Sequence, residues 1–378
     1  MIHYLVTAAQ EHSIRDYLES RGKSMADRIR ILHYEDLPDR VRFERGTYIL
    51  SALEYTSRPM RALLTAIHRQ LAEVEGFRFL NHPVRTLGRF DLLGELARTG
   101  WNPFRAVRAG GDLTGLRYPV FLRAERSHDG AVSPLLGSPR EVEAAIGRAL
   151  IVGRRLADLL VVEFCDTADE RGRYRKYGAF VIGDQIVSRR FDYGRAWMLK
   201  RENSEFSAAM GLEELEYVRT DPHADALREV CHHASVGYGC VDYAVKDRRI
   251  VVWEINVAPR IGPGRGDVQV PKPPEYERVQ ERTREIFHPK LRAAFEALDV
   301  PTAGPAVTVD VDPALRRAAR ESASGLPRQR GRLIRAFGPV RAVIEPLTTP
   351  FLPIVGRMAR RRGGRPVAGR RDHPGRSA

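Results

Sequence analysis

The sequence has few cysteines, no long apolar run and no glycine fingerprint after its first strand, and each absence excludes a class of protein. Cys165, Cys231 and Cys240 are scattered and form no Cys-x-x-Cys pair, which favours buried thiols over a disulfide framework or a zinc site. No stretch reaches the roughly 18 apolar residues that a membrane span needs, and residues 1–9 lack the charged start of a secretion signal. These absences predict a cytoplasmic protein, and 378 residues suffice for about two or three domains.

The formal net charge of +14 is concentrated at the C-terminal end of the chain. Residues 313–378 hold sixteen Arg, no Lys and three acids, which gives +13, so the preceding 312 residues carry 14 − 13 = +1. Closely spaced prolines prevent one long helix here, which predicts a disordered or peripherally bound tail. An anionic membrane or a nucleic acid is its candidate partner, and a merely solvated tail is the alternative.

Strands alternate with helices at the start of the chain. Strand patterns occupy residues 2–8, 29–33 and 47–51, and helical spacing occupies residues 13–20 and 58–73. This alternation predicts an open, largely parallel sheet over residues 1–80. Because no glycine-rich turn follows the first strand, a dinucleotide site is excluded here.

Residues 239–260 indicate two strands and a tight turn. Residues 240–245 and 250–257 are rich in Val, Ile, Tyr and Trp, whereas residues 246–249 between them form a charged run suited to a reversal of direction. We therefore expect a β-hairpin.

The hairpin carries a candidate metal site. Because strand side chains alternate between faces, Glu254 and Asn256 share one face. Asp242 lies across from Glu254 if the connection holds an odd number of residues, such as 247–249, and turns away if the number is even. Converging carboxylate and amide oxygens suit Mg²⁺, which binds through carboxylates together with substrate phosphates. A surface hairpin with a solvated polar face is the alternative.

Asp242, followed by Glu254-x-Asn256 with Pro259 and Arg260 just beyond, resembles the metal-binding end of ATP-grasp enzymes. The resemblance covers residues 81–260 with motifs in family order and, more weakly, the preceding residues. Within the ATP-grasp enzymes, the sequence resembles the group that includes RimK and glutathione synthetase.

The resemblance implies an ATP-grasp fold of α/β and α+β class in which two lobes clamp ATP. An N-terminal Rossmann-like domain would span residues 1–80, the small lobe with its linking helix 81–162, and the central lobe with the metal site 163–300. The basic tail would span 301–378.

Two arginines stand where the family has phosphate-binding lysines. Arg89 lies at the start of a predicted helix over 89–99, with Arg85 as a competing candidate, and Arg123 lies on a predicted strand over 118–125. Arginine keeps the charge but presents a planar fork to phosphate. The alternative for Arg123 is an outward side chain on a plain hairpin.

A polar loop over residues 126–133 follows that strand. It matches the family's mobile loop that closes over the triphosphate, and His128 and Gly130 within it would contact the nucleotide. Glycine allows close approach of the backbone to phosphate.

The strand over residues 159–166 resembles the segment that joins the two lobes and binds the adenine edge. Glu163, Phe164 and Cys165 match that hinge, with backbone contacts and apolar surface, and Asp166 would serve the ribose. The alternative is that this segment is an ordinary buried strand with no role in nucleotide binding.

A hairpin over residues 174–190 resembles the family's central hairpin. The family commonly has an Arg where this chain has Gly178, and Lys176, two residues earlier on the same face, is the best substitute. Arg189 and Arg190 are candidates for binding an anionic acceptor or product, with a solvated strand end as the alternative. Arg260 is a candidate for binding substrate carboxylate or the transferred phosphoryl group.

The implied reaction is the ATP-dependent activation of a carboxylate as an acyl phosphate, which an amine or thiol then attacks. Arg123, Lys176 and Arg260 would be the catalytic cations, with ATP and Mg²⁺ or Mn²⁺ as cofactors and small molecules as substrates. A phosphotransferase on the same scaffold and a degenerate nucleotide-binding protein that docks through its basic tail are the alternatives. The oligomeric state and the particular substrates are not encoded in any pattern of the sequence.

Overall fold

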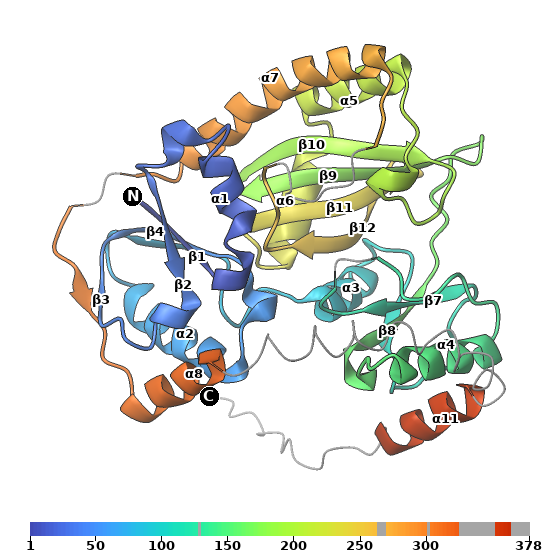
Figure 1. The fold of residues 1–378 in the computed structure, drawn as a ribbon, viewed down its shortest axis with the longest axis horizontal. Helices are drawn as coiled ribbons and strands as arrows, with labels where there is room; N and C mark the ends of the chain where they lie inside the picture. The colour runs from blue at the N-terminus through green and yellow to red at the C-terminus, as the bar shows by residue number, and fades with distance from the viewer. Residues whose placement is uncertain (128–129, 263–269, 301–302, 325–351, 364–378) are drawn as a thin grey trace, which may run out of the picture. The chain divides into compact units, whose positions relative to one another are not determined.

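The computed structural model describes residues 1–127, 130–262, 270–300, 303–324 and 352–363 (Figure 1). They belong to two compact units. Unit 1 is formed by Met1–Phe104 and the described residues of Cys165–Arg330, and unit 2 by Arg105–Phe164 and the described residues that follow Gly331. The chain thus passes between the units at residues 104–105 and 164–165. The domain boundaries expected from the sequence stay predictions.

The N-terminal sheet of unit 1 is parallel, with strand order β2-β1-β4-β5. Its strands are β1 (Ile2–Val6), β2 (Ile29–His33), β4 (Gly46–Leu50) and β5 (Phe77–Leu80). Parallel neighbours need crossover connections, and these contain α1 (His12–Leu18) and α2 (Arg58–Leu71). The helical spacing of residues 58–73 agrees with α2, in which Leu63, Leu64, Ile67 and Leu71 are all buried.

The central sheet of unit 1 is antiparallel, with strand order β10-β9-β11-β12. Its strands are β9 (Tyr174–Ile182), β10 (Gln185–Gly194), β11 (Tyr238–Lys246) and β12 (Arg249–Asn256). The mixed α/β and α+β class expected from the sequence is confirmed by these two sheets.

Four helices accompany the central sheet. They are α3 (Arg89–Arg98), α5 (Ala208–Thr220), α6 (Ala224–His233) and α7 (Pro274–Glu296), and α5 and α7 run side by side (Figure 1). Aromatic side chains hold one face of the sheet to α5 and α6. The Tyr217 hydroxyl of α5 lies 3.0 Å from the Tyr243 hydroxyl, which in turn lies 3.0 Å from Nδ1 of His223. These contacts lie on the face of the sheet that carries Tyr177 and Tyr243.

Asn81 links the two sheets of unit 1. Its side-chain amide donates to the backbone oxygens of Leu50 and Tyr238, both at 3.0 Å, and its carbonyl oxygen accepts from the backbone N–H groups of Gly237 and Tyr238 at 2.9 and 3.0 Å. Its φ of 68° is left-handed, a conformation that asparagine tolerates better than most residues. One buried amide therefore joins the end of β4 to the start of β11.

Unit 2 packs one long helix against a three-stranded antiparallel sheet. The strands are β6 (Ala106–Arg108), β8 (Leu159–Glu163) and β7 (Val120–Ala124), in that order across the sheet. Helix α4 (Pro139–Ile151) begins at Ser138, whose side chain accepts from the backbone N–H of Glu141, as the Ser-Pro-Arg-Glu sequence predicts. Its buried Val142 and Ile146 join Leu122 and Val161 of the strands in one core.

The C-terminal region contributes structure that its composition does not predict. Strand β13 (Val307–Thr308) pairs with β3 (Arg42–Phe43), and α8 (Pro313–Ser324) packs against α2. In unit 2, α11 (Leu352–Gly363) packs against α4. The described part of residues 301–378 therefore differs from the disordered or peripheral tail expected. The rest of that range lies outside the described residues.

Helix α11 accommodates a proline because Pro353 is its second residue, where no backbone donor is lost to the helix. Among the described residues, no helix is both long enough and apolar enough to span a membrane.

We expect replacement of Asn81 by glycine to destabilise the protein by about 3 kcal/mol. Glycine keeps the left-handed backbone but loses four hydrogen bonds at a buried site, each contributing on the order of 1 kcal/mol. The measurement is the free energy of unfolding from urea titrations. Asn81→Ala, which adds backbone strain, should lose a further ~1 kcal/mol; a loss under ~1 kcal/mol for Asn81→Gly would show that the amide does not hold the sheets together.

Candidate active site

The candidate metal ligands lie on one face of the central sheet. In the antiparallel register of β11 and β12, Asp242 pairs with Glu254 and Cys240 pairs with Asn256. Directly paired residues project to the same side of a sheet, as do residues two apart on one strand. The register therefore groups Asp242, Glu254 and Asn256 on a common face.

The connection between β11 and β12 holds an even number of residues. Lys246 pairs with Arg249, so the connection is the two-residue turn Asp247–Arg248, and both turn residues have positive φ. An even connection alone would turn Asp242 away from Glu254. Tyr243, however, pairs with Val252, so Trp253 is the extra residue of a β-bulge that restores the facing arrangement. The sequence left an odd and an even connection open; the connection is even, and the bulge nevertheless places Asp242 opposite Glu254.

A side chain from outside the sheet fixes β12 beside this bulge. Asn102 donates to the backbone oxygen of Val252 at 2.7 Å and accepts from its N–H at 2.9 Å. The sequence indicates only a turn at Asn102-Pro103. The structure adds that this amide pairs with the edge strand just before the bulge.

Glu254 forms a buried ion pair with Arg89. Nη2 of Arg89 lies 2.7 Å from Oε1 of Glu254, and the two side chains are 5% and 8% exposed. Arg89 is the first residue of α3, so the helix start places its guanidinium on the carboxylate of β12. The residue expected to bind phosphate thus contacts a residue expected to bind metal.

Asp242 forms an ion pair with Lys176, which the sequence also predicts to bind phosphate. Nζ of Lys176 on β9 lies 3.3 Å from Oδ2 of Asp242, and both side chains are half-buried. The carboxylate raises the pKa of the Lys176 ammonium, so the lysine stays charged at neutral pH. Each candidate metal carboxylate therefore has one cation beside it.

Gly178 and Arg190 extend the same row of the sheet. Gly178 on β9 pairs with Asp242 on one side and with Arg190 of β10 on the other. The guanidinium of Arg190 makes no hydrogen bond within the described part of the chain. Because glycine has no side chain, the space above Gly178 is open to a guanidinium from the neighbouring strand.

A bulge also brings Arg189 toward this face. Ser188 pairs with Ala179 and Arg190 with Gly178, so Arg189 is the extra residue of β10. Its guanidinium lies over the ring of Phe180, 5.4 Å from the centroid, and burial lowers its pKa to about 10. Burial also raises the pKa of the nearby Cys240 thiol to about 11, so that thiol stays protonated.

The buried carboxylate of Asp192 lies beside these cationic side chains. Burial alone would raise the pKa of Asp192 on β10, but the charges of Arg190, Lys176 and Arg201 hold it below its usual value. Nη1 of Arg201 lies 3.2 Å from Oδ1 of Asp192. Arg201 thus helps fix this edge of the face.

The donor set fits a hard cation held together with phosphate oxygens. Two carboxylates face each other, and Oδ1 of Asn256 accepts from the backbone N–H of Ala258 at 2.8 Å while keeping a second lone pair. No cluster of three His, Cys, Asp or Glu side chains suited to a metal occurs within the described ranges. Mg²⁺ commonly takes further ligands from substrate phosphates.

Arg260 follows β12 and contacts the N-terminal part of unit 1. Its Nε lies 3.9 Å from Oδ2 of Asp16 on α1. The expected role in binding a carboxylate or phosphoryl group stays a prediction. The glycine-rich stretch that follows includes residues 263–269, which are not among the described residues.

In unit 2, Arg123 is placed on β7 as expected, opposite Leu160 of β8. The loop after β7 folds back on the strand, since the backbone N–H of Val132 donates to the Leu122 oxygen at 2.7 Å. Gly130 in this loop has a φ of +91°, which favours glycine. His128 lies outside the described residues.

Glu163 is held by side chains and backbone of unit 2. Its carboxylate accepts from the backbone N–H groups of Arg105 and Arg117 at 3.0 and 2.9 Å and from both guanidinium groups, with Nη2 of Arg117 at 2.9 Å. Burial would raise the pKa of Glu163, but these donors hold it below its usual value. The carboxylate thus ties together three segments of unit 2.

The expected adenine contacts are constrained by this packing. The backbone N–H of Glu163 donates to the Arg105 oxygen at 2.9 Å, and that of Phe164 donates to the Pro119 oxygen at 3.0 Å. Asp166 accepts from the backbone N–H of Ala168 at 3.0 Å. The hinge roles of Glu163, Phe164, Cys165 and Asp166 stay predictions, with two of the backbone donors already engaged.

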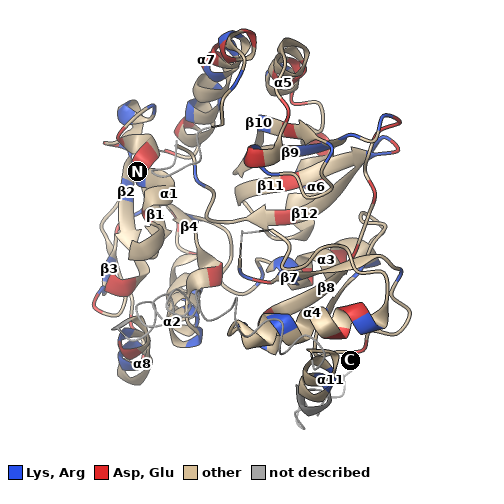
Figure 2. Cartoon of the chain, turned by 45° about the vertical axis from the view of Figure 1, so that its right-hand side comes forward, with Lys and Arg blue, Asp and Glu red and all other residues tan. Residues whose placement is uncertain are grey.

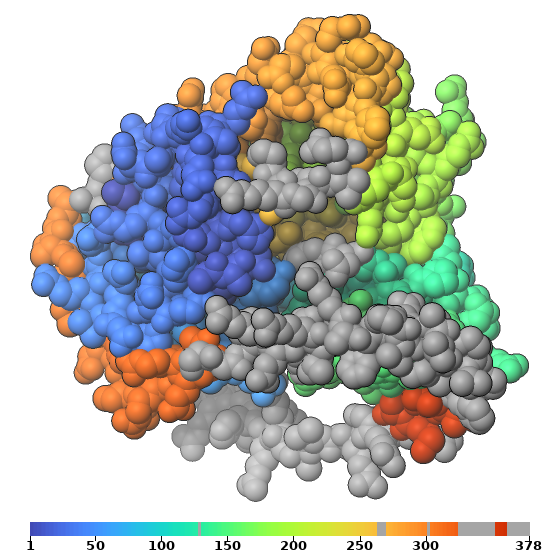
Figure 3. All heavy atoms as spheres, viewed as in Figure 1, coloured from blue at the N-terminus to red at the C-terminus, as the bar shows by residue number. Residues whose placement is uncertain are grey.

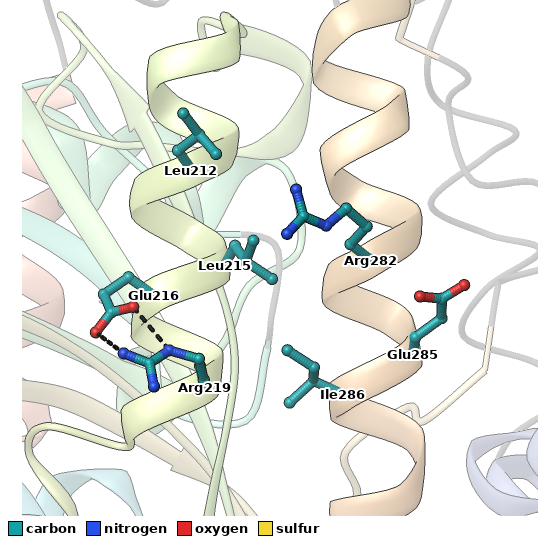
Figure 4. Close-up of a pocket in the computed structure, with 7 residues that line it drawn as sticks. All are labelled: Leu212, Leu215, Glu216, Arg219, Arg282, Glu285 and Ile286. Atoms are coloured by element: carbon teal, nitrogen blue, oxygen red, sulfur yellow. Dashed lines mark hydrogen bonds and ion pairs between the residues drawn. The ribbon is translucent and has the colours of Figure 1, made fainter.

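A groove of about 400 Å³ lies elsewhere, between α5 and α7 (Figure 4). It has apolar and charged lining residues, and Glu216 and Arg219 form an ion pair within it. The lining comprises Leu212, Leu215, Glu216, Arg219, Arg282, Glu285 and Ile286. None of the candidate site residues belongs to it.

Comparison with solved structures gives distant similarities. The chain is similar to a D-alanine–D-alanine ligase from Bacillus anthracis complexed with ATP, at 13% identity and a TM-score of 0.41 over 78% of this chain and 99% of that one. It is also similar to a RimK domain ATP-grasp protein from Sphaerobacter thermophilus, at 12% identity and a TM-score of 0.38 over 78% and 99%. The ATP-grasp ligase PsnB complexed with a minimal precursor is similar at 12% identity and a TM-score of 0.44 over 79% and 99%.

No family model and no curated protein matches the sequence. The titles of the second and third of these structures describe ATP-grasp proteins.

We expect Glu163→Gln to destabilise unit 2 by about 3 kcal/mol at pH 7, because it leaves buried donors without a charged acceptor. Since the folded-state pKa of Glu163 lies below its unfolded value, its contribution is complete above the unfolded pKa of about 4.5 and is lost as the pH falls through the folded value. Urea titrations at pH 7 and pH 3 measure the difference, which should shrink in acid. Asp158→Asn is the control, since that side chain is 41% exposed and lies 3.9 Å from Arg155; a pH-independent difference would contradict the charge-based account.

Proposed function

We propose that this chain is an ATP-grasp enzyme: an ATP-dependent, magnesium-dependent ligase that activates a carboxylate as an acyl phosphate for attack by an amine or thiol. The observation that carries the proposal is the facing pair Asp242 and Glu254, each beside a cation that the family pattern assigns to phosphate. The ATP-grasp motifs in the sequence support the same assignment.

The reaction has two displacement steps. An oxygen of the substrate carboxylate attacks the γ-phosphorus of ATP, the bond to the bridging oxygen breaks, and ADP leaves. The amine nitrogen then attacks the acyl carbon, inorganic phosphate leaves, and the nitrogen loses a proton. Neither step needs a side-chain nucleophile, because phosphoryl transfer depends on positioning and electrostatic stabilisation.

Asp242, Glu254 and Asn256 would hold Mg²⁺ or Mn²⁺ together with phosphate oxygens. When bound, the ion would neutralise negative charge on the transferred group. Cations of the chain would share this task, since Arg89 and Lys176 reach the carboxylates that border the same space.

The ion pairs of this face imply an exchange of partners on binding. Phosphate oxygens would take over Arg89 and Lys176, and their release would leave Glu254 and Asp242 free for the metal. Either ligand alone would leave a buried charge without a partner, which is costly. Metal and nucleotide are therefore expected to bind together more tightly than separately.

Arg190 fits the place of the arginine that the family has at Gly178. It lies directly across from Gly178 on the neighbouring strand, and its charge influences both Asp192 and Lys176. In this proposal its bidentate donors bind the transferred phosphoryl group or the acyl phosphate. Lys176, which pairs with Asp242, orients the nucleotide phosphates.

The test of the proposal is an ADP-release screen of the purified protein against pooled amino acids, peptides and small carboxylates. Hydroxylamine trapping separates the ligase from a phosphotransferase, since only an acyl phosphate gives a hydroxamate. Calorimetry with ATP, with and without Mg²⁺, tests the coupled binding. No heat with both ligands would favour a degenerate site.

We expect Glu254→Gln to lower ATP-dependent turnover by at least ~100-fold, the usual scale for loss of an electrostatic stabiliser. Because this change also leaves Arg89 buried without its carboxylate, Asp242→Asn serves as a second variant at a more exposed position. Glu229→Gln on α6 is the control, since that side chain is 63% exposed. Near-normal turnover of a folded Asp242→Asn protein would contradict the site.

We expect Arg190→Gln to lower kcat by ~100-fold with little change in the affinity for nucleotide. Arg190→Lys should recover part of the loss, since it keeps the charge without the fork. Arg228→Gln on α6 is the matched control, since that side chain is 47% exposed and pairs with Asp225. If Arg190→Gln turns over normally while Lys176→Gln does not, Lys176 alone fills the role.

A further inference from the structure

Helix α11 is fixed on unit 2 through one of its faces. A Cβ at Gly147 would collide with the Leu352 backbone oxygen, and a Cβ at Gly356 would collide with the Glu143 backbone oxygen. The two helices therefore meet through glycines at very close range. Arg360 adds an ion pair to Glu143 at 2.6 Å and a hydrogen bond to the Gly111 oxygen at 3.0 Å.

The other face of α11 is exposed and apolar. Ile354, Val355 and Met358 are 55%, 37% and 54% exposed, whereas Leu352 and Gly356 are buried against α4. Figure 3 shows part of α11 at the molecular surface. These three large apolar side chains lie within two turns of a short helix and form an exposed apolar cluster, which is energetically unfavourable in water.

Positive charge accompanies this apolar face. Arg357 lies on α11 and is exposed, and residues 352–378 hold eight Arg and one Asp, a net charge of 8 − 1 = +7. Figure 2 shows α11 beside α4 within unit 2. Apolar and cationic groups thus occur together at this end of the chain.

We propose that the exposed face of α11 docks the protein on the surface of an anionic phospholipid bilayer. Ile354, Val355 and Met358 would enter the boundary between headgroups and acyl chains, while Arg357 pairs with lipid phosphates. A nucleic acid would use the arginines but gain little from the apolar cluster. A second copy of the chain would bring like charges together. The bilayer surface is the partner that matches both features.

The experiment is flotation of the full-length protein with vesicles. The wild type should bind vesicles of 70:30 phosphatidylcholine and phosphatidylglycerol and should not bind pure phosphatidylcholine. Ile354→Ser/Met358→Ser should weaken binding by at least ~10-fold, and Arg357→Gln by ~5-fold. Leu212→Ser on α5, which removes a side chain that is 53% exposed, is the matched control and should bind as the wild type does.

Three outcomes overturn the proposal. The wild type fails to bind anionic vesicles, the double variant binds them as well as the wild type, or duplex DNA displaces the vesicles and binds the double variant equally. Light scattering covers the remaining occupant: a wild-type dimer that the double variant abolishes, without vesicle binding, would make this face an interface between copies. Because both replaced side chains are exposed, circular dichroism should show an unchanged fold.

Discussion

The candidate site depends on two carboxylates that face each other across β11 and β12. Like charges directly opposite each other in a sheet are destabilising, so Asp242 and Glu254 require compensation from elsewhere in unit 1. Lys176 of β9 supplies it for one and Arg89 of α3 for the other. The position of Arg89 is itself unfavourable, because a cation at the first residue of a helix opposes the helix dipole. Its ion pair with Glu254 explains why an arginine is nevertheless found there.

Much of this face follows from the sequence, because strands and alternation are local properties. Residue types alone indicate the hairpin of β11 and β12 and place Glu254 and Asn256 together. The register of Asp242 is different, since it depends on a bulge at Trp253 and on a two-residue turn made of Asp247 and Arg248. Such turns are signalled by Asn-Gly or Asp-Gly pairs, and an Asp-Arg pair does not carry that signal. The two-residue turn alone would direct Asp242 away from Glu254, and the bulge reverses that effect, so the two carboxylates face each other.

Long-range partners account for most of what the sequence left undetermined. Glu163 reads as part of a buried hinge strand, but its carboxylate binds Arg105 and Arg117, which lie 58 and 46 residues earlier. Asn81 reads as a boundary and joins two sheets across more than 150 residues. The same holds for the C-terminal region, where composition indicates poor helix formation. Its buried Val309, Ala319 and Leu352 gain their stability from neighbours that no local window contains.

Under the proposed function, Gly178 departs from the ATP-grasp pattern, and the neighbouring strands offer other residues for the missing role. A strand presents one side chain to a given face at every second residue, so a missing cation is sought two residues away on the same strand, which leads to Lys176. A sheet also places the directly opposite residues of both neighbouring strands beside that position. Arg190 and Asp242 occupy these places around Gly178. A glycine in the middle strand gives a guanidinium from β10 access to the space next to the carboxylates. In the proposed site, the role of position 178 would pass to Arg190 on the neighbouring strand, an assignment that follows from the hydrogen-bond register and not from linear spacing.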